Sequence, residues 1–473
     1  MLVHQAYRFE LGPDNAQRSG LASHAGASRF VYNWGLALVK EHVAAHKALV
    51  ALALRQGANV GQAEAWATEV TGPVPWSLPA LRRQWNRQKH DVAPWWAENS
   101  KEAYSSGLDA LARGLKAFFG SRSGNRKGRA VGFPKFKNKG SRASFRVTTG
   151  SFGVVDDRHV RLPRIGVLRT KEPTAKLARK LVDASARVLS ATVSERAGRW
   201  YVSFTCELDR LEPEVPAGAP VGVDLGAKHL AVLSTGEKVD SPKHPSRYAR
   251  RMARLQRQCS RRQGPAKGHR PSGRWRRSKT KLAKAHAKVA NARADKLHKL
   301  TTRLAKSHGA VVVEDLNVAG MTASAKGSGH WRGKAGLNRA LADASPAGLR
   351  RQLAYKTTWY GSRLVVADRW FPSSKTCSGC GTAKAKLSLS ERVLCCEHCG
   401  LLIDRDHNAA ANLAALVAAI GTASGAGTGR GKTGLRTGRG EVTGYGQCSS
   451  VNCEDGAGQP GKTATAAGQP TAA

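Results

Sequence analysis

Three acidic side chains stand where the sequence predicts that a buried element ends or begins. Asp224 ends the apolar run VGVD, Glu314 ends AVVVE, and Asp406 precedes HNAAANLAAL, whose Ala and Leu residues favour a helix. In open α/β sheets, functional side chains collect at the carboxyl ends of strands, so Asp224 and Glu314 are predicted to share one site. Clustered carboxylates repel one another unless cations neutralise them. Two Mg²⁺ or Mn²⁺ ions held by such a cluster would activate water and stabilise the leaving oxygen in phosphodiester hydrolysis.

A simpler explanation exists for each acid taken alone. An acid in the first turn of a helix gains from the helix dipole, which would account for a lone Asp406. Acids at the ends of strands are also common. The prediction of a metal site therefore depends on the three acids lying together.

Four cysteines form two closely spaced pairs before Asp406. Cys377 and Cys380 make one CxxC, fifteen residues follow, and Cys396 and Cys399 make the second. Thiolates on two such turns bind a tetrahedral Zn²⁺ ion, and a segment this short has no apolar core to fold it otherwise. Because protein ligands would fill all four positions, the predicted role of this single zinc ion is structural.

Other residues near the pairs bear on this prediction. Gly379 and Gly400 are expected to ease the tight turns, and Cys395 competes with Cys396, although Cys396 keeps the regular spacing to Cys399. The remaining cysteines are expected to be ordinary thiols or to lie in the tail: Cys206, Cys259, Cys448 and Cys453.

The chain is strongly basic along its whole length. Its 473 residues include 77 Lys and Arg against 33 Asp and Glu, a formal net charge of +44. The excess of basic residues is spread from Arg8 to Arg439 rather than confined to one tail, so a polyanion is the expected partner, and nucleic acid fits best. The alternative is a solubilising surface or attachment to acidic lipid. However, the longest apolar stretches, such as AALVAAI, are far short of the ~20 residues that a bilayer requires, so no membrane contact is expected.

The first residues, MLVHQAYRFELGPD, lack the charged leader and apolar run of a secretory signal, which predicts a cytoplasmic protein. In the reducing cytoplasm the nine cysteines are better interpreted as metal ligands or reduced thiols than as disulfides.

The elements of the N-terminal half predict a β-rich domain that is interrupted by helices. Residues 1–14 alternate like a strand, and residues 140–212 contain short strands, two of which flank Gly198 as in a hairpin. Between them, residues 15–139 are predicted to be a helical insertion that ends in a Gly-rich basic loop facing nucleic acid. Three tryptophans of the insertion would either stack on nucleobases or belong to the core: Trp85, Trp95 and Trp96.

The C-terminal half predicts an α/β domain over residues 219–372 and 401–420, with the cysteine pairs inserted over residues 373–400. From Ser241 to Leu300 the chain has twenty Lys and Arg against one acid. Within and just beyond it, the apolar spacing of residues 281–308 predicts a long helix with a basic face. A face of one sign favours contact with a phosphate backbone over a merely solvated surface. Residues 421–473 are rich in Gly, Ala and Thr without apolar periodicity, which predicts disorder.

In order along the chain, the motifs resemble those of TnpB proteins, the OrfB products of IS200/IS605-type and IS607-type insertion sequences, which are related to the type V (Cas12) CRISPR nucleases. The resemblance rests on the ordered set YRFEL, GASRFVYNWGLAL, GFPKFK, GRWYVSF, GVDLG, VVVEDLNVAGM, FPSSKTCSGCG and CEHCGLLIDRDHNAAANL. It implies a multidomain α+β fold. The β-rich part would be a wedge domain with a helical recognition insertion, and the α/β part an RNase H-like (RuvC) nuclease domain with an inserted zinc ribbon that binds target nucleic acid.

The resemblance also implies roles for residues and partners. Asp224, Glu314 and Asp406 would be the three RuvC acids. Asp406 takes the third place rather than Asp404, because the family pattern has an Asp two residues before Asn-Ala-Ala. The implied activity is an RNA-guided DNA endonuclease of a prokaryotic, nucleoid-associated protein, with a guide RNA from the transposon end and double-stranded target DNA as partners. Base pairing would supply specificity, so diffuse positive charge along the backbone is sufficient.

Other functions compete with this one. A DDE transposase has a similar fold and three acids but not a cysteine ribbon before the third acid, and a tyrosine transposase needs a His-x-His pair, which the sequence lacks. A transposition accessory DNA-binding protein without guided cleavage is a further alternative. A guided repressor derived from the same scaffold, which binds without cleaving, would be expected to have lost one of the acids, and all three are present.

Overall fold

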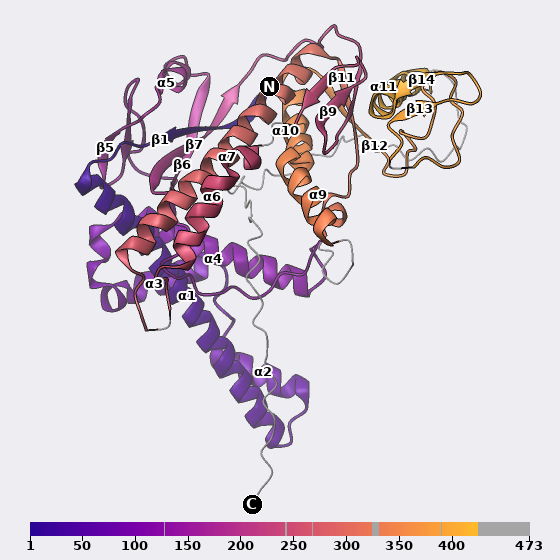
Figure 1. Cartoon of the computed structure of the whole chain (residues 1–473). Helices are drawn as coiled ribbons and strands as arrows, with labels where there is room; N and C mark the ends of the chain where they lie inside the picture. The colour runs from indigo at the N-terminus through magenta and orange to yellow at the C-terminus, as the bar shows by residue number, and fades with distance from the viewer. Residues whose placement is uncertain (127, 242–243, 267, 324–330, 389, 424–473) are drawn as a thin grey trace, which may run out of the picture.

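The computed structural model describes residues 1–126, 128–241, 244–266, 268–323, 331–388 and 390–423, and has several sheets and helices (Figure 1). The predicted disordered tail, with Cys448 and Cys453, lies outside the described residues from residue 424 onward. The predicted start of this tail at residue 421 is wrong, because residues 421–423 continue the C-terminal helix. None of the described helices is both long and apolar enough to span a membrane.

The first sheet joins the N-terminus to residues near position 200. Its strands are β1 (Leu2–Glu10), β2 (Ser144–Val147), β6 (Ala186–Arg196) and β7 (Arg199–Asp209). They lie in the order β1-β7-β6-β2, each antiparallel to its neighbour. β1 pairs with β7 along its whole length, from Leu2 opposite Asp209 to Glu10 opposite Tyr201. The strand predicted from the alternating N-terminal residues is therefore confirmed.

The hairpin predicted around Gly198 is also confirmed. β6 and β7 are joined by a turn at Ala197 and Gly198, where φ is 56° and 75°. Hairpin turns of this kind need positive φ, which glycine adopts without steric cost. The strands β3 (Gly153–Val154), β4 (His159–Leu162) and β5 (Gly166–Arg169) form a small antiparallel sheet. The sequence analysis did not predict the short helix α5 (Ala175–Val182).

Helices fill the region between β1 and β2, as predicted. They are α1 (Asn15–Arg55), α2 (Val60–Thr71), α3 (Leu78–Val92), the 3₁₀ helix η1 (Pro94–Glu98) and α4 (Lys101–Arg122). α1 begins at a capping box in which the Asp14 and Gln17 side chains each accept a hydrogen bond from the other residue's backbone N–H. α1 and α4 share one apolar core with the first sheet, whereas α2 and the end of α1 project away (Figure 1). The described residues between 123 and 143 form no helix or strand, in agreement with the predicted loop.

The tryptophans of this region differ in their environments. Trp85 belongs to the core, is 5% exposed and stacks on Tyr104 with 5.0 Å between the ring centroids. The core interpretation therefore holds for Trp85. Trp95 remains exposed, and Trp96 is half-buried with the Lys89 ammonium 3.9 Å from its ring centroid.

The second sheet contains five strands, in the order β10-β9-β8-β11-β12. They are β8 (Val221–Asp224), β9 (His229–Leu233), β10 (Lys238–Asp240), β11 (Ala310–Glu314) and β12 (Arg363–Ala367). β8, β11 and β12 run parallel, and Val223 lies opposite Val313. β9 and β10 extend the sheet in antiparallel fashion. The carboxyl ends of the three parallel strands therefore lie at one edge.

Helices cover both faces of this sheet. The elements that complete the C-terminal half are α6 (His244–Ser260), α7 (Gly273–Ser307), α8 (Val318–Met321), α9 (Trp331–Ala344), α10 (Pro346–Trp359), β13 (Val393–Cys395), β14 (Leu402–Asp404) and α11 (Arg405–Ala423). Leucines of α7 and α10 pack with Val311 and Val313, whereas Leu413 of α11 packs with Val312. Successive strand residues point to opposite faces, so both faces of β11 are apolar, and the predicted buried strand is confirmed. The predicted long basic helix is confirmed as α7.

α11 lies in direct contact with the backbone of β8. A Cβ added at Gly222 would lie 1.9 Å from the carbonyl oxygen of Ala410 and 2.7 Å from the nitrogen of Ala414. Only glycine permits this approach. The prediction that small residues let this helix lie close against a sheet is confirmed, and the contact sets the distance of Asp406 from the strand ends.

The substitution Gly222→Ala is expected to lower the free energy of unfolding by about 1–3 kcal/mol, because the added methyl group has no space and the backbone must shift. Chemical denaturation measures this change. The control is Gly336→Ala in α9, where an added Cβ meets no atom within 4 Å. The control is expected to preserve stability or raise it by up to about 1 kcal/mol. A Gly222→Ala variant as stable as the wild type would contradict the close contact.

Candidate functional site

The structure brings the three predicted acids together at one edge of the second sheet. Asp224 is the last residue of β8, and Glu314 is the last residue of the parallel neighbour β11. Asp406 is the second residue of α11, which packs on β8. Parallel strands end at the same edge, so the two strand acids are level with each other, and the helix brings the third to them.

The pKa of Asp224 reflects the short distance between the three acids. Burial, together with the negative charges of Glu314 and Asp406, raises the pKa of Asp224 to about 7, against an ordinary value of 3.8. The guanidinium of Arg405 acts in the opposite direction, and its Nε lies 3.6 Å from Asp406 Oδ1. The cluster therefore holds more negative charge than its protein surroundings neutralise, which is the condition that favours a bound cation.

Asp404 and Asp406 are two residues apart but have different roles in the structure. Asp404 Oδ1 accepts hydrogen bonds from the backbone N–H groups of Asp406 and His407, at 3.0 and 3.1 Å, so it caps α11. Its Oδ2 lies 2.7 Å from Lys238 Nζ. Burial would raise the pKa of Asp404, but the hydrogen bonds from Lys238 and from the two backbone groups lower it overall. Asp404 is therefore the residue that caps the helix, whereas Asp406 lies close enough to Asp224 for its charge to raise the pKa of Asp224.

Asp315 directly follows Glu314 but turns to other partners. Its carboxylate forms ion pairs with Arg350 and with Arg369, the latter at 3.1 Å. The hydrogen bond from Arg350 lowers the pKa of Asp315. Asp315 therefore stays ionised and paired, in contrast to Asp224.

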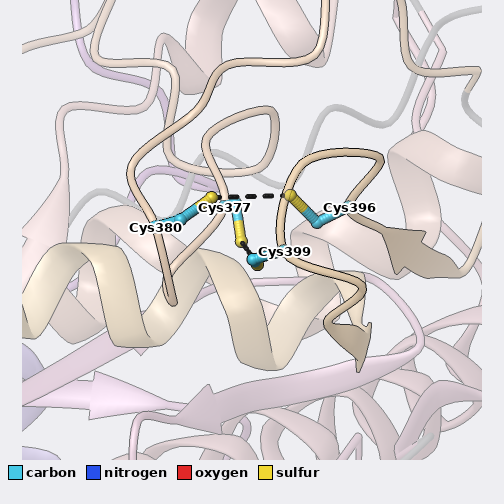
Figure 2. A group of neighbouring side chains, drawn as sticks. All are labelled: Cys377, Cys380, Cys396 and Cys399. Carbon is cyan, nitrogen blue, oxygen red and sulfur yellow. Dashed lines mark hydrogen bonds between the residues drawn. The ribbon is translucent and has the colours of Figure 1, made fainter.

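The four cysteines of the two CxxC pairs converge, as Figure 2 shows. Their sulfurs all lie within 4.8 Å of one another, with 3.6 Å between Cys377 and Cys399 and 3.5 Å between Cys380 and Cys396. Within the described ranges they are the only group of metal-ligand side chains gathered this tightly. Hydrogen bonding with Thr382 lowers the pKa of Cys380 to about 5, which favours the thiolate form that binds metals. These thiols suit a metal ion, so the residues present fit a bound metal.

Neighbouring residues refine the two turns. Cys396 belongs to the cluster, whereas Cys395 lies on β13 and is exposed. The glycines with positive φ are Gly381 and Gly400, each directly after a CxxC, and their N–H groups each donate to the first cysteine's carbonyl at 2.9 Å. The prediction that Gly379 eases the first turn is therefore wrong.

Gly379 is instead restricted by packing, because an added Cβ would lie 3.2 Å from Leu401 Cδ2. Cys206 is buried and Cys259 is partly buried, both outside the cluster.

Sequence reasoning missed three polar residues between the acids and the cysteines. Ser373 Oγ donates to Glu314 Oε1 at 2.5 Å, and its carbonyl accepts from Asn412 at 2.7 Å. Asn408, one turn before Asn412, accepts from the N–H of Ser378 at 2.8 Å. The available signal was the pair of asparagines four residues apart in an otherwise alanine-rich helix, which places two amides on one face.

Basic surfaces lie on two other parts of the molecule. α6 and α7 run side by side (Figure 1) and pack through Leu255, Leu282 and Ala285. An open groove of about 390 Å³ is lined by Arg250, Arg251, Arg254 and Arg257. A second cleft, of about 790 Å³ at the end of α4, is lined by aromatic and basic residues that include Trp76, Phe119, Arg113, Lys116 and Arg126. Both surfaces suit an anionic polymer, and the second also offers aromatic rings.

Family models match three stretches of the chain. Residues 203–325 match the OrfB model of IS605 elements, described as "Probable transposase", and residues 347–413 match "Cas12f1-like, TNB domain". Residues 1–48 match the "Helix-turn-helix domain" of the same OrfB proteins. Over these last residues the structure has strand β1 followed by the single helix α1.

Several relatives that are named as RNA-guided DNA endonucleases align with most of the chain. One from Mycobacterium tuberculosis strain H37Rv is 38% identical over 430 residues, 87% of this chain and 86% of the relative. One from Streptomyces pristinaespiralis is 35% identical, covering 87% and 89%. InsQ of Escherichia coli K12 is 30% identical, covering 87% and 92%. A solved Cas12f1–guide RNA–target DNA complex aligns with a TM-score of 0.43 at 13% identity, covering 87% of this chain and 99% of that one, which is too distant to carry an argument.

The fold and the site define an α/β protein in which a carboxylate cluster and a four-cysteine cluster adjoin within a strongly basic chain. The chain belongs to the TnpB family, the OrfB proteins of IS605-type insertion sequences, since relatives 30–38% identical extend over most of its length.

The raised pKa of Asp224 predicts a pH dependence of stability in the absence of divalent cations. Between pH 3.8 and about 7 the folded protein holds a proton that the unfolded protein has lost, so stability falls as pH rises through this window. Each unit of pKa difference corresponds to about 1.4 kcal/mol. Asp224→Asn is therefore expected to be a few kcal/mol more stable than the wild type at pH 8, with a smaller difference at pH 5.

Chemical denaturation at the two pH values, without added divalent ions, measures this difference. Glu212→Gln, which removes one negative charge from an exposed position, is the control and is expected to show no gain that depends on pH. A gain for Asp224→Asn of equal size at both pH values would contradict the raised pKa.

Proposed function

We propose that this chain is an RNA-guided DNA endonuclease that cleaves target DNA by metal-dependent phosphodiester hydrolysis. The observation that carries the proposal is the cluster of Asp224, Glu314 and Asp406, in which burial and the two neighbouring charges raise the pKa of the Asp224 carboxyl group. The names of the relatives support guided cleavage of DNA. Guide RNA from the transposon end and double-stranded DNA would be its partners, in the cytoplasm of a prokaryote near the nucleoid.

In this proposal the second sheet with its helices, over residues 219–372 and 401–420, is an RNase H-like (RuvC) nuclease domain. The parallel strands β8, β11 and β12 with antiparallel β9 and β10 support it. Residues 373–400 are a zinc ribbon that binds target nucleic acid, residues 1–14 and 140–212 a wedge domain, and residues 15–139 a recognition insertion.

Asp224, Glu314 and Asp406 would hold two Mg²⁺ or Mn²⁺ ions. When bound, these ions would supply the charge that activates water and stabilises the leaving oxygen. Ser373 orients Glu314, Asp404 caps the helix that carries Asp406, and Gly222 sets the helix against β8.

The basic surfaces complete the proposal. Guide pairing would read the sequence, so the protein needs contacts only with the sugar-phosphate backbone of the heteroduplex. The arginine-lined groove on α6 and the aromatic and basic cleft at α4 are suited to such contacts. The four clustered cysteines would hold one structural Zn²⁺ ion.

A transposase that transfers DNA strands is the second candidate, because the matching family model is described as a transposase. The two functions differ in their products. A guided nuclease linearises a plasmid that carries the target, whereas strand transfer joins one DNA end to another molecule. The assay described next separates them.

In a plasmid-cleavage assay with the protein, RNA from its own genomic flank and Mg²⁺, Asp406→Asn is expected to slow target cleavage by about a hundredfold or more. The reason is that bound ions are worth several kcal/mol to the transition state, and 1.4 kcal/mol corresponds to tenfold in rate. The matched control is Asp404→Asn, because asparagine also caps helices. It is expected to cleave within a few-fold of the wild type. Equal loss in both variants, or no guided cleavage by the wild type, would refute the proposal.

Cys396→Ser is expected to abolish binding of the single zinc ion, because a three-ligand site loses most of its affinity and the turn loses its anchor. Cys395→Ser changes an adjacent exposed thiol outside the cluster and is expected to retain one zinc per chain. Metal analysis of the purified proteins measures the stoichiometry. Retention of zinc by Cys396→Ser together with its loss in Cys395→Ser would show that Cys395 is the ligand.

A further inference from the structure

The cysteine cluster and the carboxylate cluster share one connecting segment, residues 372–378. This segment follows β12 and leads into the first cysteine turn, with Cys377 buried between Thr376 and Ser378. The N–H groups of Lys375 and Thr376 both donate to the carbonyl of Pro372, at 3.0 Å, so the backbone forms a tight turn. A movement of the first cysteine turn would therefore move this segment.

Two asparagines of α11 hold the segment from the helix side. Asn412 Nδ2 donates to the carbonyls of Ser373 and Thr376, both at 2.7 Å. Asn408 Nδ2 donates to Thr376 at 2.7 Å and Ser373 at 3.4 Å, and its Oδ1 accepts from Ser378. Both asparagines are buried: Asn408 is 0% exposed and Asn412 is 8% exposed. Buried amides with this many partners fix the geometry of the groups that they join.

The segment also reaches the carboxylates. Ser373 is 4% exposed, and its hydroxyl donates to Glu314. Asn408 is two residues from Asp406 on the same helix. Through these contacts the segment is tied directly to one acid and, through α11, to the helix that carries another.

We infer that Ser373, Asn408 and Asn412 form a clamp through which the four-cysteine cluster positions Glu314 and Asp406 for binding divalent ions. The inference rests on the proposed function, because it takes the carboxylates as the ligands of those ions. The clamp residues are positioning residues: they bind no ion themselves. A metal ion on the four sulfurs fixes the first cysteine turn, the asparagines hold that turn to α11, and the Ser373 hydroxyl holds Glu314.

The test measures binding of Mn²⁺ to the full chain without nucleic acid, by electron paramagnetic resonance, for the wild type and four variants. Ser373→Ala removes only the hydroxyl to Glu314 and is expected to weaken Mn²⁺ binding by about 10–100-fold, as outer-shell substitutions in metal sites do. Ser374→Ala is the matched control. Ser374 is partly exposed, and its substitution removes the same kind of hydroxyl group from the neighbouring position. Mn²⁺ binding is therefore expected to remain that of the wild type.

The third variant tests the link to the cysteines. Asn412→Ala is expected to weaken Mn²⁺ binding and also to speed release of zinc to a chromogenic chelator at least tenfold, whereas Ser373→Ala leaves the rate of zinc release unchanged. Ser373→Thr, which retains a hydroxyl, is expected to restore Mn²⁺ binding. A residue that only supports the fold would lower the melting temperature without this division between the two metals.

The outcomes separate the clamp from the proposed function. Wild-type affinity for Mn²⁺ in both Ser373→Ala and Asn412→Ala would overturn the clamp, as would unchanged zinc release in Asn412→Ala. If the wild type binds Mn²⁺ and the variants behave as expected but no guided cleavage occurs, the clamp stands and the endonuclease proposal fails. If the wild type binds no Mn²⁺, both are overturned.

Discussion

Repulsion between three carboxylates at the edge of a buried sheet is the constraint on which the C-terminal half of this structure depends. Asp224 is affected most, because burial adds to the charges of Glu314 and Asp406 and raises its pKa to about 7. Without compensation such a group costs free energy when it ionises. The fold nevertheless brings the acids together in two ways. The parallel strands β8 and β11 end at the same level, and α11 lies directly against the backbone of Gly222. Within the protein, the Arg405 guanidinium supplies positive charge beside Asp406. Under the proposed function, divalent ions would supply the remainder.

The surroundings separate the acids that take part from those that do not. Asp404 and Asp315 are sequence neighbours of Asp406 and Glu314, yet each is satisfied by its own cations or backbone donors, which lower its pKa. The acids of the cluster have fewer such partners. Adjacent acids thus have different environments, and under the proposed function only the acids of the cluster would bind ions.

The sequence predicted the parts of the site that follow from local pattern. The ends of the apolar runs located Asp224 and Glu314, and the spacing of the cysteines located the cluster, because a short metal-binding turn needs little from the rest of the fold. It did not predict that β8 and β11 are neighbours, since their pairing joins residues about ninety positions apart. Nor did it predict the partners of Ser373 and Asn412, or that Gly381 rather than Gly379 has positive φ. Such features depend on contacts between distant segments. The short helix α5 was missed because eight residues provide little periodicity.

The pairing of β1 with β7 has a consequence for the order in which the chain assembles. The partner of β1 follows it in the chain by about two hundred residues, from Arg199 to Asp209. At 5–20 residues per second, synthesis of the intervening chain takes about 10–40 s. Throughout that interval the alternating apolar side chains of β1 lack their sheet, while α1, with its capping box, depends only on local hydrogen bonds and can form early. β1 is thus synthesised well before its partner and positioned late, and its insertion beside β7 completes the edge of the first sheet.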